Sequence, residues 1–319
     1  MNSNDHFPRL LGDIGGTNAR FAWQQTPEAP LTDIATYPCA DHESLLRAMQ
    51  HYLQAYAKPA PDWCAIGIAN PIVGDHVQMT NHDWSFSISA VQKGLGADRF
   101  LVINDFTALA LALPALTEAD LMQVGGGAPV ADAPLALLGA GTGLGVSGLL
   151  RGSVPLGGEG GHVTLSAVDD LEDAVVRQLR LRFGHASAER ALSGPGLVNL
   201  YEALCAVAGV AVQPRTAAEV SALAEAGTDA QCVQAEALFF SFLGTLAGNL
   251  ALSLGALGGV YIGGGIVPKM GRRIFNSSFR DRFESKGRFK AYLAAIPVYV
   301  IDAKVSPALI GATRALDSL

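Results

Sequence analysis

The stretch LLGDIGGTNARFAW, residues 10–23, places a glycine-rich turn between two apolar runs. Apolar runs of this length on either side of a turn predict two paired β-strands. Glycines let a ligand come close to the backbone, and several N–H groups of such a turn can point at the oxygens of a phosphate. The stretch therefore predicts a hairpin that is either phosphate-binding or purely structural. The turn residues that would hold phosphate are Gly12, Gly15, Gly16, Thr17 and Asn18.

Asp13 is the acidic residue of this turn. A carboxylate repels phosphate unless a cation lies between the two groups. Mg²⁺ is the natural cation, and in proteins it keeps much of its hydration shell. We therefore predict that Asp13 is a Mg²⁺ ligand, bound to the ion through water.

Two further glycine turns follow apolar strands. In PLALLGAGTGLGVSGLL, residues 134–150, the strand–turn–strand pattern of residues 10–23 is repeated, which suggests two related lobes. Thr142 can donate to a phosphate there. In GGVYIGGGIVP, residues 258–268, Gly263, Gly264 and Gly265 would let a flat base lie against the backbone, unless they only connect a strand to a helix.

Other nucleotide-binding patterns fit less well. Gly143, Gly145 and Gly148 satisfy G-x-G-x-x-G, but a dinucleotide fingerprint requires that the turn open a helix. The residues that follow, VSGLL, predict a strand instead. A Walker A loop is excluded because no lysine of the chain is preceded by glycine.

Asn104 and Asp105 lie where the predicted strand LVI ends and a helix begins. Functional residues of α/β proteins gather at such strand ends. Asp105 could accept the proton of an attacking hydroxyl as a general base, and Asn104 could hold a neighbouring hydroxyl. The alternative is an ordinary helix cap, a common role of Asn and Asp.

Further polar candidates suit the hydroxyls of a sugar. Glu159 and His162 lie in the glycine-padded segment GGEGGHV, where the alternative for His162 is a core histidine. Glu189 is expected in a helix, with a solvent-facing charge or a pairing with Arg190 as its alternatives. Asn81 could line the pocket, and Trp84, in the same segment, could form a wall of it or belong to the core.

Composition restricts the class of protein. The chain has 319 residues, a length that suits two lobes. Its net charge is −7 and it has no basic run, so we expect no nucleic-acid partner. Its four cysteines are scattered without a C-x-x-C pair, and its first residues lack the pattern of a signal peptide. A cytoplasmic protein is expected.

One segment resembles a membrane span. No charged residue occurs between Glu236 and Lys269, and Gly244 and Gly248 have the GxxxG spacing of membrane helices. Polar residues and a glycine break divide the run, and basic residues do not flank it closely at both ends. We therefore expect a buried helix and strand and no membrane partner, with Gly244 and Gly248 marking a close backbone contact.

Segments typical of strands and helices alternate along the chain, which predicts an α/β protein. A helix is expected from His42 with Asp41 as its cap, and mostly helical structure is expected over residues 169–254, with a break at Gly194-Pro195-Gly196. Ser306–Leu319 predicts a closing helix that returns to the first lobe. We expect a small domain of residues 1–114 plus 303–319 and a large domain of residues 115–302.

These pieces together resemble the bacterial glucokinases, because eight segments occur in the order found in that family. They are LLGDIGGTNARFA, MTNHDWSFSI, INDFTA, GAGTGLGV, GGEGGHV, SAERALSGPGLVNLY, GNLAL and GGVYIGGGIVP. The resemblance covers nearly the whole chain. It implies a two-lobed actin-like ATPase (ribonuclease H-like) fold with an interdomain cleft, and it implies ATP-dependent phosphorylation of glucose.

The resemblance also implies a role for each motif. Asp105 would take the proton of the glucose 6-hydroxyl, and Asn104, Glu159, His162, Glu189 and Asn81 would hold the other hydroxyls. Gly12, Asp13, Gly15, Gly16, Thr17 and Asn18 would bind the terminal phosphates and Mg²⁺. Gly141, Thr142 and Gly143 would form a second phosphate loop, and Gly263, Gly264 and Gly265 would contact the adenosine. The family is typically homodimeric, which the apolar helix of residues 230–254 could support.

The chain departs from neighbouring families in informative ways. The cysteine-rich zinc motif of related repressor–kinases is missing after EGGH, where HVTLSAVDDLED follows, so we expect no zinc. We also expect no helix-turn-helix segment ahead of Gly12, which argues against a sugar-sensing repressor. Asn70 stands where glucokinases often have a cysteine. A kinase for another hexose and a catalytically inactive sugar-binding regulator remain the alternatives.

Overall fold

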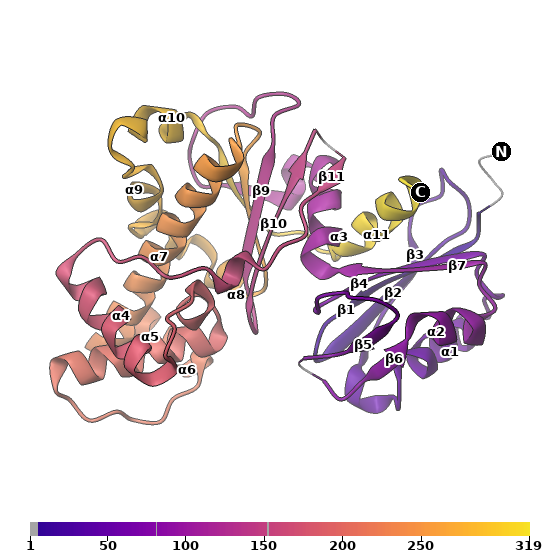
Figure 1. Cartoon of the computed structure of the whole chain (residues 1–319), viewed down its shortest axis with the longest axis horizontal. Helices are drawn as coiled ribbons and strands as arrows, with labels where there is room; N and C mark the ends of the chain where they lie inside the picture. The colour runs from indigo at the N-terminus through magenta and orange to yellow at the C-terminus, as the bar shows by residue number, and fades with distance from the viewer. Residues whose placement is uncertain (1–5, 81, 152) are drawn as a thin grey trace. The chain divides into compact units, whose positions relative to one another are not determined.

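The computed structural model describes residues 6–80, 82–151 and 153–319. The chain divides into two units (Figure 1). The first unit comprises Met1–Thr117, Ser153–Gly157 and Ala303–Leu319, and the second comprises Glu118–Gly152 and Gly158–Asp302. Each unit is described here by itself.

The first unit contains a five-stranded sheet in the order β3-β2-β1-β4-β7. The predicted hairpin is its centre: β1 pairs antiparallel with β2, whereas β1, β4 and β7 run parallel. The strands are β1 (Arg9–Ile14), β2 (Asn18–Gln24), β3 (Thr32–Pro38), β4 (Trp63–Ile68) and β7 (Arg99–Asn104). Outside this sheet lie β5 (His76–Gln78), β6 (Ser85–Ser87) and β11 (Val154–Pro155).

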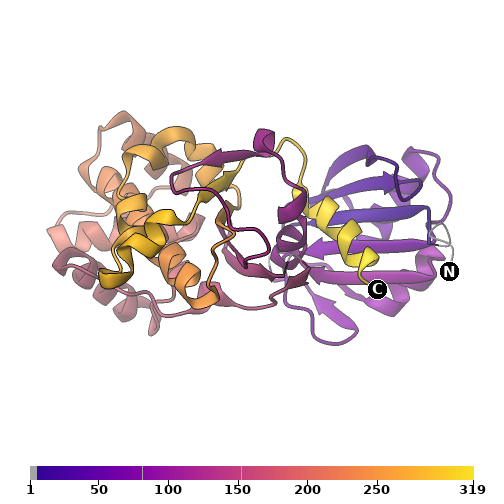
Figure 2. The ribbon, with the colours of Figure 1, turned by 90° about the horizontal axis from the view of Figure 1, so that it is seen from above.

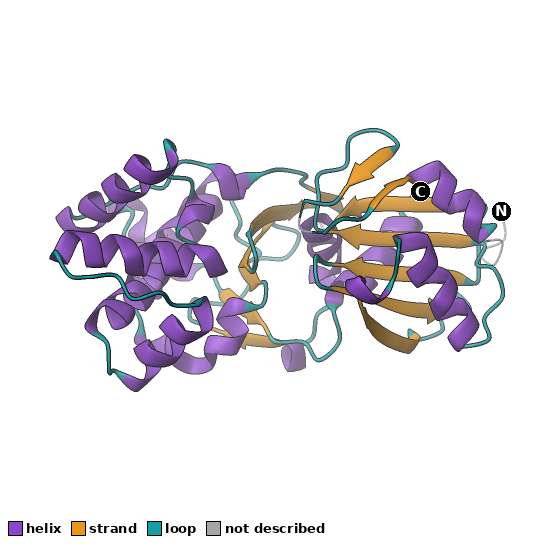
Figure 3. Ribbon diagram, turned by 90° about the horizontal axis from the view of Figure 1, so that it is seen from below, coloured by secondary structure: helices purple, strands orange, loops and turns teal. Residues whose placement is uncertain are grey.

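Helices cover both faces of this sheet, as Figures 2 and 3 show. Side chains alternate across a strand, so Leu10 packs with the residues of α1 and α2, whereas Leu11 packs with Leu309 of α11. The α11 helix also crosses α3 so closely that a Cβ on Gly311 would lie 1.7 Å from the carbonyl oxygen of Ala108. The helices are α1 (Leu45–Ala55), α2 (Ile88–Leu95), α3 (Asp105–Ala112) and α11 (Pro307–Asp317).

The cap of α1 differs from the prediction. The helix begins at Leu45, and Ser44 caps it by accepting the backbone N–H of Arg47. Asp41, the predicted cap, belongs instead to the short 3-10 turn Cys39–Asp41. Asp and Ser are comparable caps, so residue type alone could not choose between them.

The second unit repeats the strand pattern of the first. In the order β10-β9-β12-β13-β8, β9 pairs antiparallel with β10, and β9, β12 and β13 are parallel. This arrangement confirms the internal repeat expected from the sequence. The strands are β8 (Leu121–Gln123), β9 (Leu135–Ala140), β10 (Leu144–Leu150), β12 (Val260–Gly263) and β13 (Val298–Ile301).

Helix α7 is the centre of the helical part of this unit. It packs against α5, α6 and α9, and a Cβ on Gly244 or Gly248 would lie 2.2 or 2.5 Å from the carbonyl oxygen of Phe279 or Phe283 in α9. The two glycines therefore mark a close backbone contact, as predicted. Within the described residues α7 is the one helix long and apolar enough to cross a membrane, and 61% of its most apolar stretch of 18 residues is buried inside the protein.

The remaining helices surround α7 and the sheet. They are α4 (Asp170–Phe183), α5 (Gly194–Ala208), α6 (Ala217–Ala226), α7 (Ala230–Leu254), α8 (Ile266–Met270), α9 (Phe279–Glu284) and α10 (Lys290–Ala295). Gly194-Pro195-Gly196, predicted as a break, is the first turn of α5, with Ser193 as its cap. Proline suits the first turn of a helix because the N–H it lacks has no partner there.

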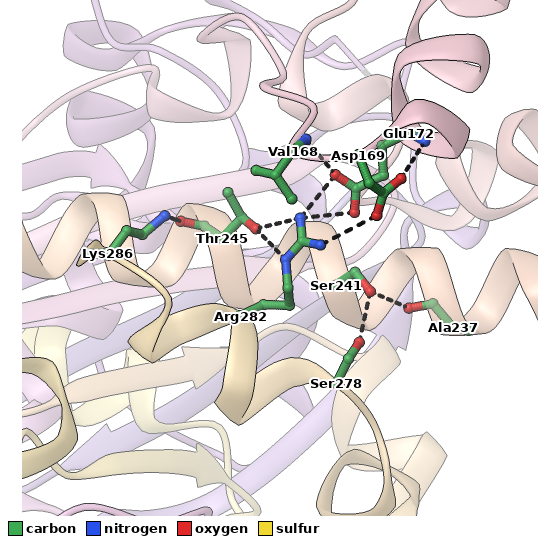
Figure 4. A network of polar contacts seen from close by, with 9 residues as sticks. All are labelled: Val168, Asp169, Glu172, Ala237, Ser241, Thr245, Ser278, Arg282 and Lys286. Carbon is green, nitrogen blue, oxygen red and sulfur yellow. Dashed lines mark hydrogen bonds and ion pairs between the residues drawn. The ribbon is translucent and has the colours of Figure 1, made fainter. Parts of the chain in front are cut away.

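A buried polar network joins α4, α7 and α9 (Figure 4). Glu172 of α4 is fully buried, and one of its carboxylate oxygens lies 2.8 Å from an Nη of Arg282. Arg282 also donates to the hydroxyl of Thr245 in α7. The backbone N–H of Val168 donates to the same carboxylate. The network therefore fixes three helices to one another around a charge that has no access to water.

Candidate functional site

In the first unit, three parallel strands end at the same edge of the sheet. Ile14 of β1 is in register with Ile68 of β4, which is in register with Asn104 of β7. Ligands of α/β folds bind at the carboxyl ends of parallel strands. The turn after β1 and the Asn104–Asp105 pair, which are separate motifs in the sequence, therefore lie at one edge.

The turn after β1 is a tight hairpin. The N–H of Gly15 donates to the carbonyl of Asn18 at 2.9 Å, and the carbonyl of Thr17 accepts the N–H of Cys39 at 2.8 Å. A Cβ on Gly12 would lie 2.6 Å from Ile66, whereas a Cβ on Gly15 would meet nothing nearer than 3.6 Å. Packing inside the sheet thus explains Gly12, and the surroundings of Gly15 have room for a ligand.

Asp13 is held in place by two partners. Arg20 lies 3.2 Å from its Oδ2, and the hydroxyl of Ser306 donates to the same oxygen at 2.6 Å. The sequence prediction missed Ser306, although a serine just before the closing helix was a signal for a capping or bonding residue. Both of these contacts use Oδ2, so Oδ1 can still accept from a metal-bound water.

The chemistry of these donors fits Mg²⁺. No group of three or more His, Cys, Asp or Glu side chains that could hold a metal occurs within the described residues. Mg²⁺ does not need such a cage, because it usually keeps several waters and takes one or two carboxylates together with substrate phosphates. Asp13 beside the open glycine turn suits that kind of site.

Asn104 is a helix cap, the alternative that the sequence left open. Its Oδ1 accepts the N–H groups of Phe106 and Thr107 at 2.9 and 3.2 Å. Asp105 is the first residue of α3, and its Oδ1 accepts the N–H of Phe106 at 2.9 Å. The capping uses only the oxygen of Asn104, so its amide nitrogen is a donor that a cap does not require.

The segment after β4 supplies another polar residue at this edge. Asn70 accepts the N–H and the hydroxyl of Thr80 at 3.1 and 2.7 Å, which fixes the chain next to position 81. Asn81, a predicted sugar ligand, lies outside the described residues. Trp84 is 3% exposed and donates its indole N–H to the carbonyl of His42, so it belongs to the core and is no pocket wall.

In the second unit, the neighbouring parallel strands β9 and β12 bring two glycine turns together. A Cβ on Gly264, which has a φ of +75°, would lie 2.3 Å from the carbonyl oxygen of Ala140. In contrast, a Cβ on Gly141 or Gly265 would meet nothing within 4 Å. The turn after β9 opens strand β10 and no helix, which excludes the dinucleotide-binding reading of G-x-G-x-x-G.

Glu159 and His162 lie beside the glycine turn between β9 and β10. The 3-10 turn Gly160–His162 packs on β10 so tightly that a Cβ on Gly161 would lie 2.1 Å from the carbonyl oxygen of Leu144. Both Glu159 and His162 are exposed. His162 is therefore not a core histidine, and both side chains are accessible to a ligand.

The environment of Glu189 differs from both structural alternatives considered for it, a solvent-facing helix charge and a pair with Arg190. It lies in the 3-10 turn Ala188–Arg190 rather than in an α-helix, and its Oε2 accepts the N–H of Leu144 at 2.9 Å. The guanidinium of Arg190 stacks over Phe183 instead of pairing with Glu189. The N–H of Ala188 donates to the carbonyl of Val163 at 2.8 Å, which brings Glu189 next to the segment of His162.

The predicted residues thus form two groups, one in each unit. The first group has the glycine hairpin, Asp13 and the Asn104–Asp105 pair at one sheet edge. The second has both remaining glycine turns, Glu159, His162 and Glu189 around the adjoining ends of β9, β10 and β12. Each group combines a phosphate-compatible turn with carboxylates or amides that suit hydroxyls.

Comparisons with known proteins agree with this arrangement. Residues 10–319 match the glucokinase family. The chain is 54% identical to a glucokinase of Aromatoleum aromaticum over 99% of its own length and 96% of that protein. It also matches the bifunctional protein glk of Burkholderia pseudomallei with 49% identity, spanning 48% of that longer protein.

Solved structures give the same result. A glucokinase from an Antarctic psychrotroph is 38% identical, with a TM-score of 0.88 over 98% of this chain and 99% of that one. A ROK family glucokinase from Streptomyces griseus, in complex with glucose and AMPPNP, shares the fold at 16% identity, with a TM-score of 0.65 over 96% and 98% of the two chains. The expected actin-like ATPase fold is confirmed, and the chain belongs to the glucokinase family of sugar kinases.

Proposed function

We propose that this protein transfers the γ-phosphoryl group of ATP to the 6-hydroxyl of glucose. The observation that carries the proposal is the shared sheet edge of the GDIGGTN hairpin and the Asn104–Asp105 pair in a chain of the glucokinase family. One motif has the chemistry of a phosphate site and the other that of a general base. The proposed boundaries of the two lobes are residues 1–114 plus 303–319 and residues 115–302.

In this proposal Asp105 accepts the proton of the 6-hydroxyl as its oxygen attacks the γ-phosphorus. The bond between that phosphorus and the β,γ-bridging oxygen breaks, and ADP leaves with the electron pair. Phosphoryl transfer needs little covalent help from a protein, because positioning and charge stabilisation supply most of the effect. A general base contributes on the order of 10²–10⁴-fold.

The other residues bind and orient the two substrates. Asn81, Asn104, Glu159, His162 and Glu189 hold the remaining sugar hydroxyls. The hairpin residues Gly12, Gly15, Gly16, Thr17 and Asn18 and the second turn, Gly141, Thr142 and Gly143, hold the phosphates. Gly263, Gly264 and Gly265 hold the adenosine. Asp13 holds Mg²⁺ through water, and the bound ion would neutralise charge on the phosphate oxygens.

Substitution of the base tests the mechanism. Asp105→Asn keeps the shape of the side chain but removes its basicity, so we expect kcat to fall at least about 100-fold while glucose still binds. Asp98→Asn is the matched control, because Asp98 is exposed and precedes the opposite end of the same strand, β7. ADP release in a coupled assay, with glucose binding measured by calorimetry, gives both quantities. Wild-type turnover in Asp105→Asn would contradict the role of Asp105.

The choice of sugar and the presence of catalysis need a separate assay. A panel of glucose, mannose, fructose and amino sugars at equal concentration shows which hexose drives ATP consumption, and glucose should give the highest kcat/KM. A higher value for another hexose would make the protein a kinase for that sugar. Sugar binding without ATP consumption would make it a catalytically inactive regulator.

We also propose a cytoplasmic homodimer, as the family resemblance implies. Sedimentation equilibrium should give twice the 33.2 kDa of one chain. A mass of one chain at micromolar concentration would contradict the dimer.

A further inference from the structure

Two hydrogen bonds tie the segment of Glu189 to both sides of the second glycine turn. The N–H of Leu144, just after the turn, donates to Glu189 Oε2 at 2.9 Å. The N–H of Gly194 donates to the carbonyl of Gly141, at the beginning of the turn, at 2.8 Å. A side chain assigned to the sugar is therefore bonded to the backbone of a turn assigned to the nucleotide.

The two glycines of this turn have different surroundings. A Cβ on Gly143 would lie 2.6 Å from Glu189 Oε2, whereas a Cβ on Gly141 would meet nothing within 4 Å. Real Cβ atoms do not approach an oxygen as closely as 2.6 Å. Gly143 thus leaves the space that the Glu189 carboxylate occupies, and Gly141 leaves open space where a ligand can approach.

The support behind Glu189 is rigid. The hydroxyl of Ser193 donates to the carbonyl of Glu189 at 2.8 Å and accepts the N–H of Gly196 at 2.9 Å as the cap of α5. A Cβ on Gly196 would lie 2.5 Å from the backbone of Ala191. The 3-10 turn of Glu189 is therefore packed onto the first turn of a 15-residue helix, which fixes the position of the carboxylate.

We propose that Glu189 is a positioning residue for the nucleotide turn as well as a ligand of the sugar, so that it couples the two substrate sites. This inference rests on the proposed function. A carboxylate has two oxygens with about four acceptor positions, so Oε2 can hold Leu144 while a sugar hydroxyl donates to the same group. Hydrogen bonds to a charged acceptor are among the strong ones, and the bond holds the turn in place before any sugar binds.

The contact between Glu189 and the turn gives two separate expectations. Removal of the carboxylate should weaken nucleotide binding even when no sugar is present. Displacement of the carboxylate from the side of the turn should weaken sugar binding even when no nucleotide is present. A residue that only holds sugar would not give the first effect, and a residue that is not in contact with the turn would not give the second.

The experiment measures binding of Mg²⁺–AMPPNP without sugar and of glucose without nucleotide, by calorimetry on the whole protein. For Glu189→Ala we expect AMPPNP affinity to fall about tenfold, the size of one lost charge-assisted hydrogen bond. Glu189→Gln keeps an acceptor oxygen, so it should restore most of the nucleotide affinity but not the glucose affinity. For Gly143→Ala we expect glucose affinity to fall, also about tenfold, because the new methyl group pushes Oε2 away.

His162→Ala is the matched control, since His162 is exposed and belongs to the same sugar group. It should weaken glucose binding and leave AMPPNP binding unchanged. Unchanged AMPPNP affinity in a folded Glu189→Ala variant would overturn the coupling. Should Glu189→Ala fail to fold, unchanged glucose affinity in Gly143→Ala would overturn it instead. Failure of the wild-type protein to bind AMPPNP at all would refute the proposed function and is separate from these results.

Discussion

Asp13, Asn104 and Glu189 each have a structural partner inside their own unit. Asp13 is bonded to Ser306, Asn104 caps α3, and Glu189 accepts the N–H of Leu144. A carboxylate or amide oxygen accepts more than one hydrogen bond, so such a partner does not exclude a ligand. The structural role also fixes the side chain, which positions it for binding. For Asn104, the roles of helix cap and of sugar ligand are therefore compatible.

Asp229 provides a residue-scale prediction outside the site. It caps α7, accepting the N–H of Cys232 at 2.9 Å, and pairs with Arg215 at 2.7 Å. The hydrogen bond from Cys232, and with it the charge of Arg215, lowers the pKa of Asp229 below its ordinary value of 3.8. A lowered pKa means that the ionised cap stabilises the fold above pH 3.8 and that this contribution is lost as the pH falls through the folded pKa.

Asp229→Ala should therefore lower the free energy of unfolding by about 1 kcal/mol at pH 7, and this difference from the wild type should shrink as the pH falls below about 3.8. Urea unfolding at pH 7 and at stepwise lower pH measures both. Asp229→Asn is the control, because it keeps a capping oxygen but cannot titrate. A deficit of Asp229→Ala that stays constant down to pH 2 would contradict the argument.

At the scale of elements, glycines set how closely the helices cross. Gly244 and Gly248 bring α7 against the carbonyl groups of α9, and Gly311 brings α11 against α3. In each case the atom that a Cβ would strike belongs to a backbone, which cannot move away as a side-chain end can. A helix that is apolar all round is either a core helix or a membrane span. The long apolar sequence of α7 is therefore explained by its burial on several sides.

Gly244→Ala and Gly94→Ala form a matched pair. A Cβ on Gly94 would lie 2.6 Å from the flexible end of Leu46, whereas a Cβ on Gly244 would lie 2.2 Å from a carbonyl oxygen. Overpacking typically costs about 1–3 kcal/mol, and alanine favours a helix over glycine by about 1 kcal/mol. We expect a net loss of about 1–2 kcal/mol for Gly244→Ala, because the cost of the backbone clash exceeds the gain in helix propensity, and no loss for Gly94→Ala in urea unfolding. Equal effects would show that backbone contact is not the cause.

At the scale of the whole molecule, the chain has separate hydrophobic cores. One large core fills the second unit, and two smaller ones lie on the two faces of the sheet of the first unit. The polar network of Glu172 and Arg282 belongs entirely to the second unit. A change in this network should therefore destabilise one unit first.

Arg282→Met leaves the Glu172 carboxylate buried without its cation. Removal of one partner of a buried pair costs about 3–5 kcal/mol, whereas replacement of both by apolar residues is often close to neutral. We expect amide hydrogen exchange to show lost protection in α4, α7 and α9 of Arg282→Met, and the double variant Glu172→Met with Arg282→Met to recover part of it. Equal protection in the wild type and the single variant would show that the pair contributes nothing.

The sequence alone was sufficient to predict the strand–turn–strand motifs, their repetition, the α/β class and the family. These features depend on local periodicity, on glycine spacing and on the order of motifs, all of which are written along the chain. The helix of residues 230–254 and the close contact at its two glycines could also be predicted from local pattern. The charge-free run, the polar residues and glycines that divide it, and the GxxxG spacing are all visible in the sequence.

Only the tertiary structure determined which partner each site residue has. The hydrogen bond from Ser306 to Asp13 joins residues that are 293 positions apart in the sequence, and the one from Leu144 to Glu189 joins residues that are 45 positions apart. Strand register and the packing of helices bring such residues together, and no local spacing encodes these contacts. For the same reason the sequence could not decide between core and pocket wall for Trp84 or show that Gly143 leaves room for a carboxylate, since both depend on atoms contributed by distant segments.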